Sequence, residues 1–245
     1  MKIIHQLVLL LLLLPCFVGM QSLKAQTRTV GKIYYDENLA SLGYTLFSPN
    51  QSFKTYLIEN CGLRVHEWSS TYQPGMMAYL LEDGNLLRSG RDWSNASFAS
   101  NGGNGGYFEI LDWWSQRLWL YKVSDTRHLA HHDFTPLPNG NLLVVAWEKF
   151  DFSQCKAAGR DTTTLPNNEV WSEAIYELQP IFPDSAKVIW EWHVWDHLVQ
   201  DFDPSRNNYG SVGDHPERMD INYLGISQGA DDWLHANTVS YNPVR

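Results

Sequence analysis

Two short segments of the sequence combine a histidine with an acidic or amide side chain just before a turn. The first contains His131, His132 and Asp133, and the second contains His235 and Asn237. Near neutral pH an imidazole can serve as a nucleophile, a proton carrier or a hydrogen-bond donor to an anion. A histidine at the same place in two repeated units puts two imidazoles at equivalent ends of neighbouring units. We therefore predict a site on an axis of pseudosymmetry.

Alignment of the two segments assigns their roles. His131 and Asp133 match His235 and Asn237, with one residue between the members of each pair. We predict His131 and His235 as catalytic residues that face one channel, and His132 and Asn237 as substrate-binding residues. Neighbouring strand residues face opposite sides, so His132 should point away into packing, although a register error of one residue would exchange it with His131. The alternative is that each histidine only satisfies a buried turn.

The remaining histidines give little support for a metal centre. His193 and His197 are four residues apart and could share a metal if their segment were helical. The aromatic run over residues 190–193 instead favours a strand with a packed edge, so no metal and no cofactor are predicted. The Gly-x-Ser-x-Gly, phosphate-loop and His-Glu-x-x-His motifs are also absent from the sequence.

Charge balance and the first residues indicate where the protein acts. The chain has 18 Lys and Arg against 27 Asp and Glu, a formal net charge of −9. This acidity disfavours partners such as nucleic acid or an anionic membrane, although a local pocket could still hold an anionic substrate. Residues 1–25 combine Lys2, an apolar run over 7–14 and Ala25, as in a secretory signal peptide. We expect an exported protein, periplasmic or extracellular, that leaves the membrane after signal removal.

Two cysteines, Cys61 and Cys155, would remain in the mature chain. Export permits a disulfide between them, and two buried unpaired thiols are an equally open alternative. The sequence also leaves open whether the protein forms a homodimer.

Turn signals divide most of the chain into short strands rather than long helices. The pairs Asp83-Gly84 and Asn139-Gly140 lie between apolar runs, and Gly-Asn-Leu-Leu occurs at both 84–87 and 140–143. Such turns favour hairpins. We predict four of them, pairing 76–81 with 85–88, 107–112 with 117–121, 134–137 with 142–147, and 174–178 with 187–192. Repeated four-stranded units are typical of a β-propeller, with a β-sandwich as the alternative.

We expect three parts along the chain: the signal peptide over 1–25, an N-terminal β-rich segment over 26–75, and a partial β-propeller over 76–245. At about 40–50 residues per blade, the third part would supply about three blades, too few to close a ring. Smaller elements are expected as follows: strands at 29–35, 44–47 and 55–58, loops over 92–106 and 153–168, a short helix within 194–199, and a long loop over 200–220.

Four further motifs lie in the C-terminal part of the chain. They are Trp190–His197, Asp214–Pro216, Asp220–Tyr223 and Asp232–Asn237. Together with His131–Asp133 they resemble the N-terminal portion of the exported, propeller-type aryl-sulfate sulfotransferases. The resemblance extends over the whole mature chain and implies an all-β fold, a six-bladed propeller that follows an N-terminal β-rich segment.

The same resemblance implies a reaction. Enzymes of that family transfer a sulfuryl group from a phenolic sulfate ester to a phenol through a sulfo-histidine, and His131 and His235 match two histidines that surround the sulfate. Their nucleophile and an arginine follow the Asp232–Asn237 motif, so we expect this chain to lack both and to show little activity alone. The alternative function is a non-catalytic exported β-protein that binds an aryl or glycan ligand.

Overall fold

The computed structural model describes residues 34–98, 102–165, 167–224 and 231–244, and it divides into two compact units. The first unit is Met1–Ser41, and its described part contains a turn in which Leu39 and Ala40 donate to the Asp36 carbonyl. The second unit, Leu42–Arg245, holds every strand of the described chain. Both histidine segments therefore belong to the second unit.

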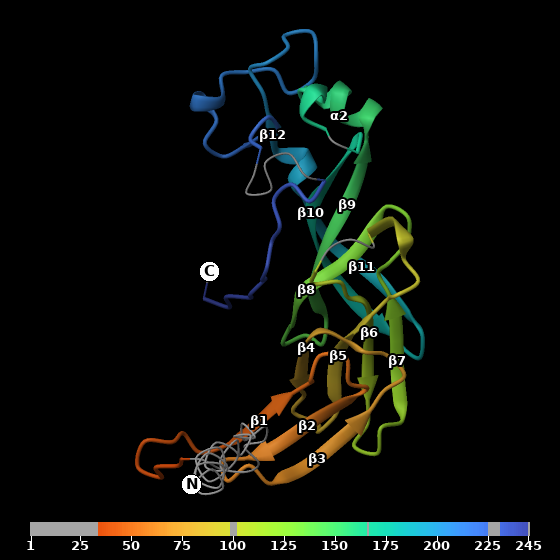
Figure 1. Ribbon diagram of the computed structural model, residues 1–245, viewed down its shortest axis with the longest axis vertical. Helices are drawn as coiled ribbons and strands as arrows, with labels where there is room; N and C mark the ends of the chain where they lie inside the picture. The colour runs from red at the N-terminus through yellow and green to blue at the C-terminus, as the bar shows by residue number, and fades with distance from the viewer. Residues whose placement is uncertain (1–33, 99–101, 166, 225–230, 245) are drawn as a thin grey trace, which may run out of the picture. The chain divides into compact units, whose positions relative to one another are not determined.

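The second unit begins with a three-stranded antiparallel sheet (Figure 1). Its strands are β1 (Tyr44–Phe47), β2 (Lys54–Glu59) and β3 (Arg64–Ser69). The first two confirm the strands predicted at 44–47 and 55–58. Most of the strand predicted at 29–35 lies outside the described residues, and Tyr34 and Tyr35 are in no strand.

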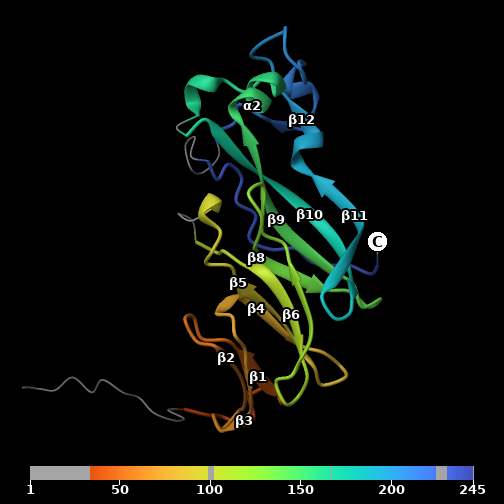
Figure 2. The same ribbon diagram turned by 90° about the vertical axis from the view of Figure 1, so that its right-hand side faces the viewer.

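Two four-stranded antiparallel meanders follow, each formed by four consecutive strands (Figures 1 and 2). The first contains β4 (Pro74–Leu80), β5 (Leu86–Arg91), β6 (Gly106–Leu111) and β7 (Arg117–Lys122). The second contains β8 (His128–Pro136), β9 (Leu142–Asp151), β10 (Glu169–Ile181) and β11 (Ser185–His193). All four predicted hairpins are confirmed, because β4 pairs with β5, β6 with β7, β8 with β9 and β10 with β11.

The first turns of the two meanders are built alike. In one, Leu81 N–H donates to the Asn85 carbonyl at 2.8 Å, and in the other Leu137 N–H donates to the Asn141 carbonyl at 2.8 Å. Gly84 and Gly140 have φ of +83° and +84°, a backbone conformation that glycine adopts without steric cost. The repeated Gly-Asn-Leu-Leu sequence therefore encodes one turn twice, and it sets the register of both meanders.

A shared apolar core joins the two meanders. Phe108 and Trp119 of the first pack with Phe134 and Val144 of the second, and all four side chains are buried. Trp119 Nε1 also donates to the Ser185 carbonyl at 2.7 Å. This core fixes β8, the strand that carries His131 and His132, against the first meander.

Residues after β9 form a cap of short elements around a second apolar cluster. The helix α2 (Phe152–Ala158) begins with a capping box between Asp151 and Gln154 and ends at Gly159 in the left-handed conformation. The loop predicted over 153–168 is therefore wrong in its first part. The predicted short helix is found as the 3-10 helix Val194–His197.

The remaining elements of the described chain are short. They are β12 (Leu198–Val199) and β13 (Met219–Asp220), which pair in parallel, and the 3-10 helices Ala96–Phe98, Thr162–Thr164 and Val212–Asp214.

The fold is all-β: within the described residues α2 is the only α-helix, and neither meander closes on itself. No helix in the described ranges is long and apolar enough to cross a membrane. Cys61 is exposed and Cys155 is buried, and the two form no disulfide with each other. Burial raises the pKa of the Cys155 thiol to about 12.

Candidate functional site

A bulge interrupts β8 at the predicted site. Ala130 faces Ala146 and Phe134 faces Val144, so residues 131–133 lie opposite a single residue of β9. The alternation of side chains across a strand depends on a regular register, and it fails where extra residues are inserted. The faces to which His131 and His132 point therefore cannot be deduced from alternation.

The bulge brings both histidine rings to the same place. His132 has φ of 48°, and its Nδ1 atom lies 2.9 Å from Nδ1 of His131. Its backbone N–H donates to the Gly103 carbonyl at 2.8 Å. A Cβ on Gly103 would come within 2.0 Å of the His132 ring, so glycine is required there. The expectation that His132 points away into packing is wrong, because the left-handed residue turns its ring back beside His131.

His131 is the buried member of the pair. Its side chain is 0% exposed, and its ring stacks on Trp147 with a centroid separation of 3.8 Å. Nε2 of His131 lies 2.9 Å from a carboxyl oxygen of Glu173. Burial lowers the pKa of His131 to about 3, so the ring is neutral at physiological pH. With both nitrogens bonded inside the protein, His131 is placed to orient other groups.

His132 and His235 form the accessible part of the cluster. Their ring centroids are 4.7 Å apart, whereas those of His131 and His235 are 6.3 Å apart. Both side chains are partly exposed. Nδ1 of His235 is held by a carboxyl oxygen of Asp232, and Nδ1 of His132 is held by His131. In the described part of the chain neither Nε2 atom has a hydrogen-bond partner.

His132 and His235, but not His131, have a positive φ. His132 and His235 have φ of 48° and 58°, and Met76 has φ of 117°. Met76 is the central residue of a similar bulge in β4, where residues 75–77 lie opposite Ser89. His132 and Met76 thus share a positive φ in equivalent bulges, and His235 has a positive φ in the C-terminal segment. The catalytic roles of His131 and His235 stay predictions.

Two buried acids hold the cluster together. Glu173 of β10 lies beside His131 and also accepts the backbone N–H of Ala236 at 2.8 Å. Asp232 binds His235 and accepts Nε1 of Trp147 at 3.0 Å. Burial raises the pKa of Glu173 to about 8, and the N–H of Ala236 opposes that rise only in part.

Glu173 and Asp232 were not predicted from the sequence. Glu173 lies in an ordinary strand sequence and offers no local signal. Asp232 lies three residues before His235, a spacing that could have suggested an orienting partner.

The amide and acidic neighbours act on the backbone. Asp133 accepts the hydroxyl of Thr238 and the N–H of Val239, which ties β8 to the C-terminal segment. Asn237 is exposed, and its side-chain amide donates to the His235 carbonyl at 3.2 Å. The substrate-binding role of Asn237 stays a prediction.

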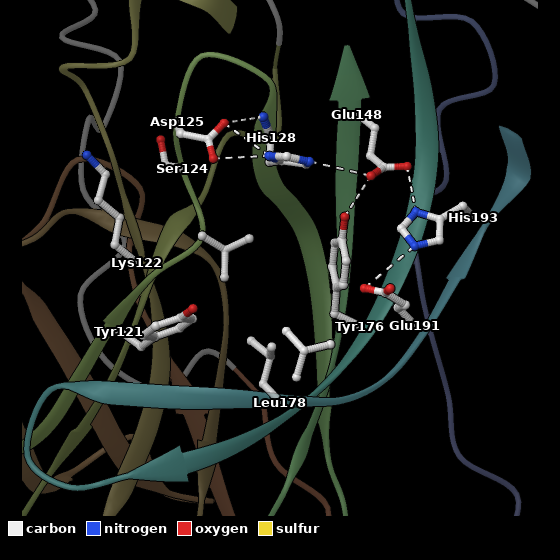
Figure 3. A pocket seen from close by; sticks show the side chains of 12 residues that line it. Tyr121, Lys122, Ser124, Asp125, His128, Glu148, Tyr176, Leu178, Glu191 and His193 are labelled. Carbon is white, nitrogen blue, oxygen red and sulfur yellow. Dashed lines mark hydrogen bonds and ion pairs between the residues drawn. The ribbon is translucent and has the colours of Figure 1, made fainter. Parts of the chain in front are cut away.

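A separate cavity of about 350 Å³ lies between β7 and the second meander (Figure 3). In its lining Glu148 accepts the Tyr176 hydroxyl at 2.8 Å and contacts Nδ1 of His193 at 2.8 Å. Nε2 of His128 lies 3.5 Å from the same carboxylate. Burial would raise the pKa of Glu148, but the hydrogen bonds from His128, His193 and Tyr176 outweigh it and lower that pKa. This cavity contains none of the predicted site residues.

The histidine pair considered for a metal is divided in the structure. His193 faces Glu148, while His197 stacks on Trp192 with a centroid separation of 5.0 Å. Among the described residues no cluster of three or more His, Cys, Asp or Glu side chains has a metal-binding arrangement.

Comparison with known proteins identifies the family. The family model described as Arylsulfotransferase (ASST) matches residues 115–245, slightly more than half of the chain. The matched region includes both histidine segments, Glu173 and the cavity around Glu148. No curated protein matches the sequence. From the family match, the chain belongs to the arylsulfotransferase family.

Proposed function

We propose that this arylsulfotransferase moves a sulfuryl group from a phenolic sulfate ester to a phenol, and that His132 and His235 contact the sulfate. One observation carries the proposal: two partly exposed imidazoles lie 4.7 Å apart, each held at Nδ1 by the protein, with no hydrogen bond to Nε2 among the described residues. His131, predicted as catalytic, takes the role of a positioning residue because it is buried.

The geometry suits an anionic sulfate ester. Charge on the sulfuryl oxygens changes during transfer, and hydrogen-bond donors fixed in advance stabilise that charge without reorganisation. Asp232 holds His235 and His131 holds His132, so neither ring must lose much rotational freedom when the ester binds. The two imidazoles supply these hydrogen bonds to the ester.

The family resemblance supports a sulfo-histidine intermediate. In the first step the sulfur–oxygen bond to the phenol breaks, a sulfur–nitrogen bond to histidine forms, and the phenolate leaves. In the second step the acceptor oxygen attacks sulfur, the sulfur–nitrogen bond breaks and frees the histidine, and the acceptor proton passes through water to the phenolate released in the first step. Covalent catalysis divides one difficult transfer into two easier ones. The nucleophile is a histidine other than His131, whose side chain is fully covered.

We propose a β-propeller architecture and export for the same protein. Support for the propeller comes from two consecutive four-stranded meanders with the same first turn and a bulge at the same place. The segment that carries His235 supplies a third left-handed position of the same kind. Export rests on the signal-like sequence of residues 1–25.

Binding and turnover of 4-nitrophenyl sulfate test the function. Equilibrium dialysis measures binding of the ester, and nitrophenolate release in the presence of phenol measures transfer. We expect His132→Gln and His235→Gln to weaken binding about tenfold or more, since a hydrogen bond to a charged group contributes about 1.5–3 kcal/mol. The control is His197→Gln, which alters a histidine that stacks on Trp192 away from the cluster.

Each outcome decides between the functions. Nitrophenolate release above background, or a sulfuryl adduct on the chain by mass spectrometry, supports the enzyme. Specific binding with neither signal is expected of a sulfotransferase chain that lacks its nucleophile as well as of the aryl-binding alternative, and preference for a sulfate ester over the free phenol then favours the sulfotransferase. Binding that is unchanged in both His132→Gln and His235→Gln would remove the assignment of the site.

A further inference from the structure

We propose that Glu173 is a positioning residue that determines, through His131, which ring nitrogen of His132 carries a proton. The inference rests on the proposed function only in the last step, where His132 meets the sulfate. Glu173 is buried and touches no substrate, but in this proposal it controls whether His132 donates or accepts a hydrogen bond.

The three side chains form one continuous hydrogen-bonded line. A carboxyl oxygen of Glu173 lies 2.9 Å from Nε2 of His131, and Nδ1 of His131 lies 2.9 Å from Nδ1 of His132. His131 and Glu173 have side chains that are 0% and 6% exposed, so water cannot replace these contacts. The line runs from the interior to His132, which is partly exposed.

The Glu173–His131 and His131–His132 hydrogen bonds each contain one proton. The protonation of Glu173 is therefore coupled to the position of the proton on His132. When Glu173 is a neutral acid, it donates to Nε2 of His131, and His131 then carries its proton on Nδ1. That N–H donates to Nδ1 of His132, so the neutral His132 carries its own proton on Nε2. In this state His132 presents an N–H donor toward a sulfuryl oxygen.

Loss of one proton from the line reverses both hydrogen bonds. Glu173 becomes a carboxylate and accepts the proton of Nε2 of His131. Nδ1 of His131 must then accept, so the proton of His132 lies on Nδ1 and its Nε2 carries a lone pair. In this state Nε2 repels an anionic oxygen.

The surroundings of Glu173 favour the neutral acid. It faces Asp232 and His235 from the C-terminal segment and His131 and His132 from β8. Burial raises the pKa of Glu173 to about 8, with the N–H of Ala236 acting in the opposite direction. The donor form of His132 therefore exists at neutral pH and is lost as the pH rises through this value.

Nitrogen NMR of the unaltered chain tests the coupling without any substrate. Protonated and bare imidazole nitrogens have well-separated ¹⁵N shifts, and His132→Gln identifies the resonances of His132 by their disappearance. Between about pH 6 and about pH 9 we expect the proton of His132 to move from Nε2 to Nδ1. A His132 that keeps one tautomer over this range would overturn the proposal.

The variant Glu173→Gln provides the second test. The glutamine oxygen can accept the N–H of Ala236 and its amide can donate to His131, but the amide cannot ionise. We expect His132 to stay protonated on Nε2 throughout the titration. Glu148→Gln is the matched control, because Glu148 holds His193 in the other cavity, and it should leave the transition of His132 unchanged. A transition that persists in Glu173→Gln would contradict the proposal even if the wild-type titration fits.

Activity gives a separate readout. If the chain transfers sulfate, kcat/KM for 4-nitrophenyl sulfate should fall above about pH 8 in the wild type and stay level in Glu173→Gln. Little turnover is expected of a chain that lacks the family's nucleophile, so ester binding that is unchanged in both His132→Gln and His235→Gln is the result that refutes the proposed function, and the NMR result still decides the coupling. Turnover with no tautomer change refutes the coupling alone.

Discussion

Two glutamates of the second meander, Glu173 and Glu148, each contact histidines, yet the two clusters have opposite electrostatics. Glu173 is buried with His131, and burial raises the pKa of the acid to about 8 and lowers that of the imidazole to about 3. Glu148 lines an open cavity, where hydrogen bonds overcome its burial and lower its pKa, while the contact with Glu148 raises the pKa of His128. The buried Glu173–His131 pair is therefore neutral near neutral pH, whereas Glu148 is a carboxylate.

The difference comes from the number of donors and from access to water. Glu148 receives the Tyr176 hydroxyl and lies within reach of His128 and His193, so its negative charge is well compensated. Glu173 receives one backbone N–H and one imidazole contact, in a closed space that it shares with Asp232. The same pair of residue types thus favours a charged carboxylate in one environment and a neutral hydrogen bond in the other.

The largest expected effect comes from removing Trp147, the side chain that packs against His131. Trp147 is 0% exposed, stacks on His131 and donates to Asp232. We expect Trp147→Ala to lower the free energy of unfolding by about 3–5 kcal/mol, through the cavity and the lost donor. Urea denaturation measures this loss. Trp190→Ala, at a residue 48% exposed on β11, should cost about 1 kcal/mol or less, and equal losses would mean that the packing around His131 is not special.

The next effect concerns pH and separates the two glutamates. Because folding raises the pKa of Glu173, its contribution to stability is full below its unfolded value and is lost as the pH rises to about 8. We expect Glu173→Gln to remove a loss of a few kcal/mol between about pH 5 and about pH 8. Chemical denaturation at a series of pH values measures it. A variant with the same slope as the wild type would show that Glu173 ionises freely.

The smallest effect is expected in the charged cluster. Tyr176→Phe removes one donor to Glu148 and should cost about 1 kcal/mol near neutral pH. Since folding lowers the pKa of Glu148, its contribution is present above the unfolded value and lost as the pH falls, and the variant should reduce this acid dependence. Tyr121→Phe is the control, because the Tyr121 hydroxyl makes no hydrogen bond within the described ranges. Equal changes in both variants would count against a charged Glu148.

Local sequence signals predicted the strands well because the turns are local. Gly84 and Gly140 each need only their own few neighbours to form a turn, and the flanking apolar runs supply the strands. The helix α2 was missed although Asp151, Gln154 and Gly159 carried its capping signals, because a helix of seven residues shows little periodicity.

The site was predicted in part. The sequence placed His132 and His235 in repeated segments, and the structure brings their rings together. It selected His131 from the spacing that His131 and Asp133 share with His235 and Asn237. It also expected His132 to point away, because alternation assumes a regular strand and the bulge at 131–133 is visible only in the pairing with β9. Glu173 reaches the site through strand pairing across 42 residues of sequence, a relation that no local pattern contains.

The repeated bulge makes the site chemistry separable from the architecture. A left-handed, non-glycine residue costs on the order of 1–3 kcal/mol, yet this conformation recurs at Met76, His132 and His235 with two different side chains. The backbone, not the side chain, fixes where each residue is displayed. Each unit can therefore exchange a thioether for an imidazole, or the reverse, while its turns and strand register stay unchanged. Such interchangeable positions would let relatives of this chain acquire new ligand preferences one unit at a time.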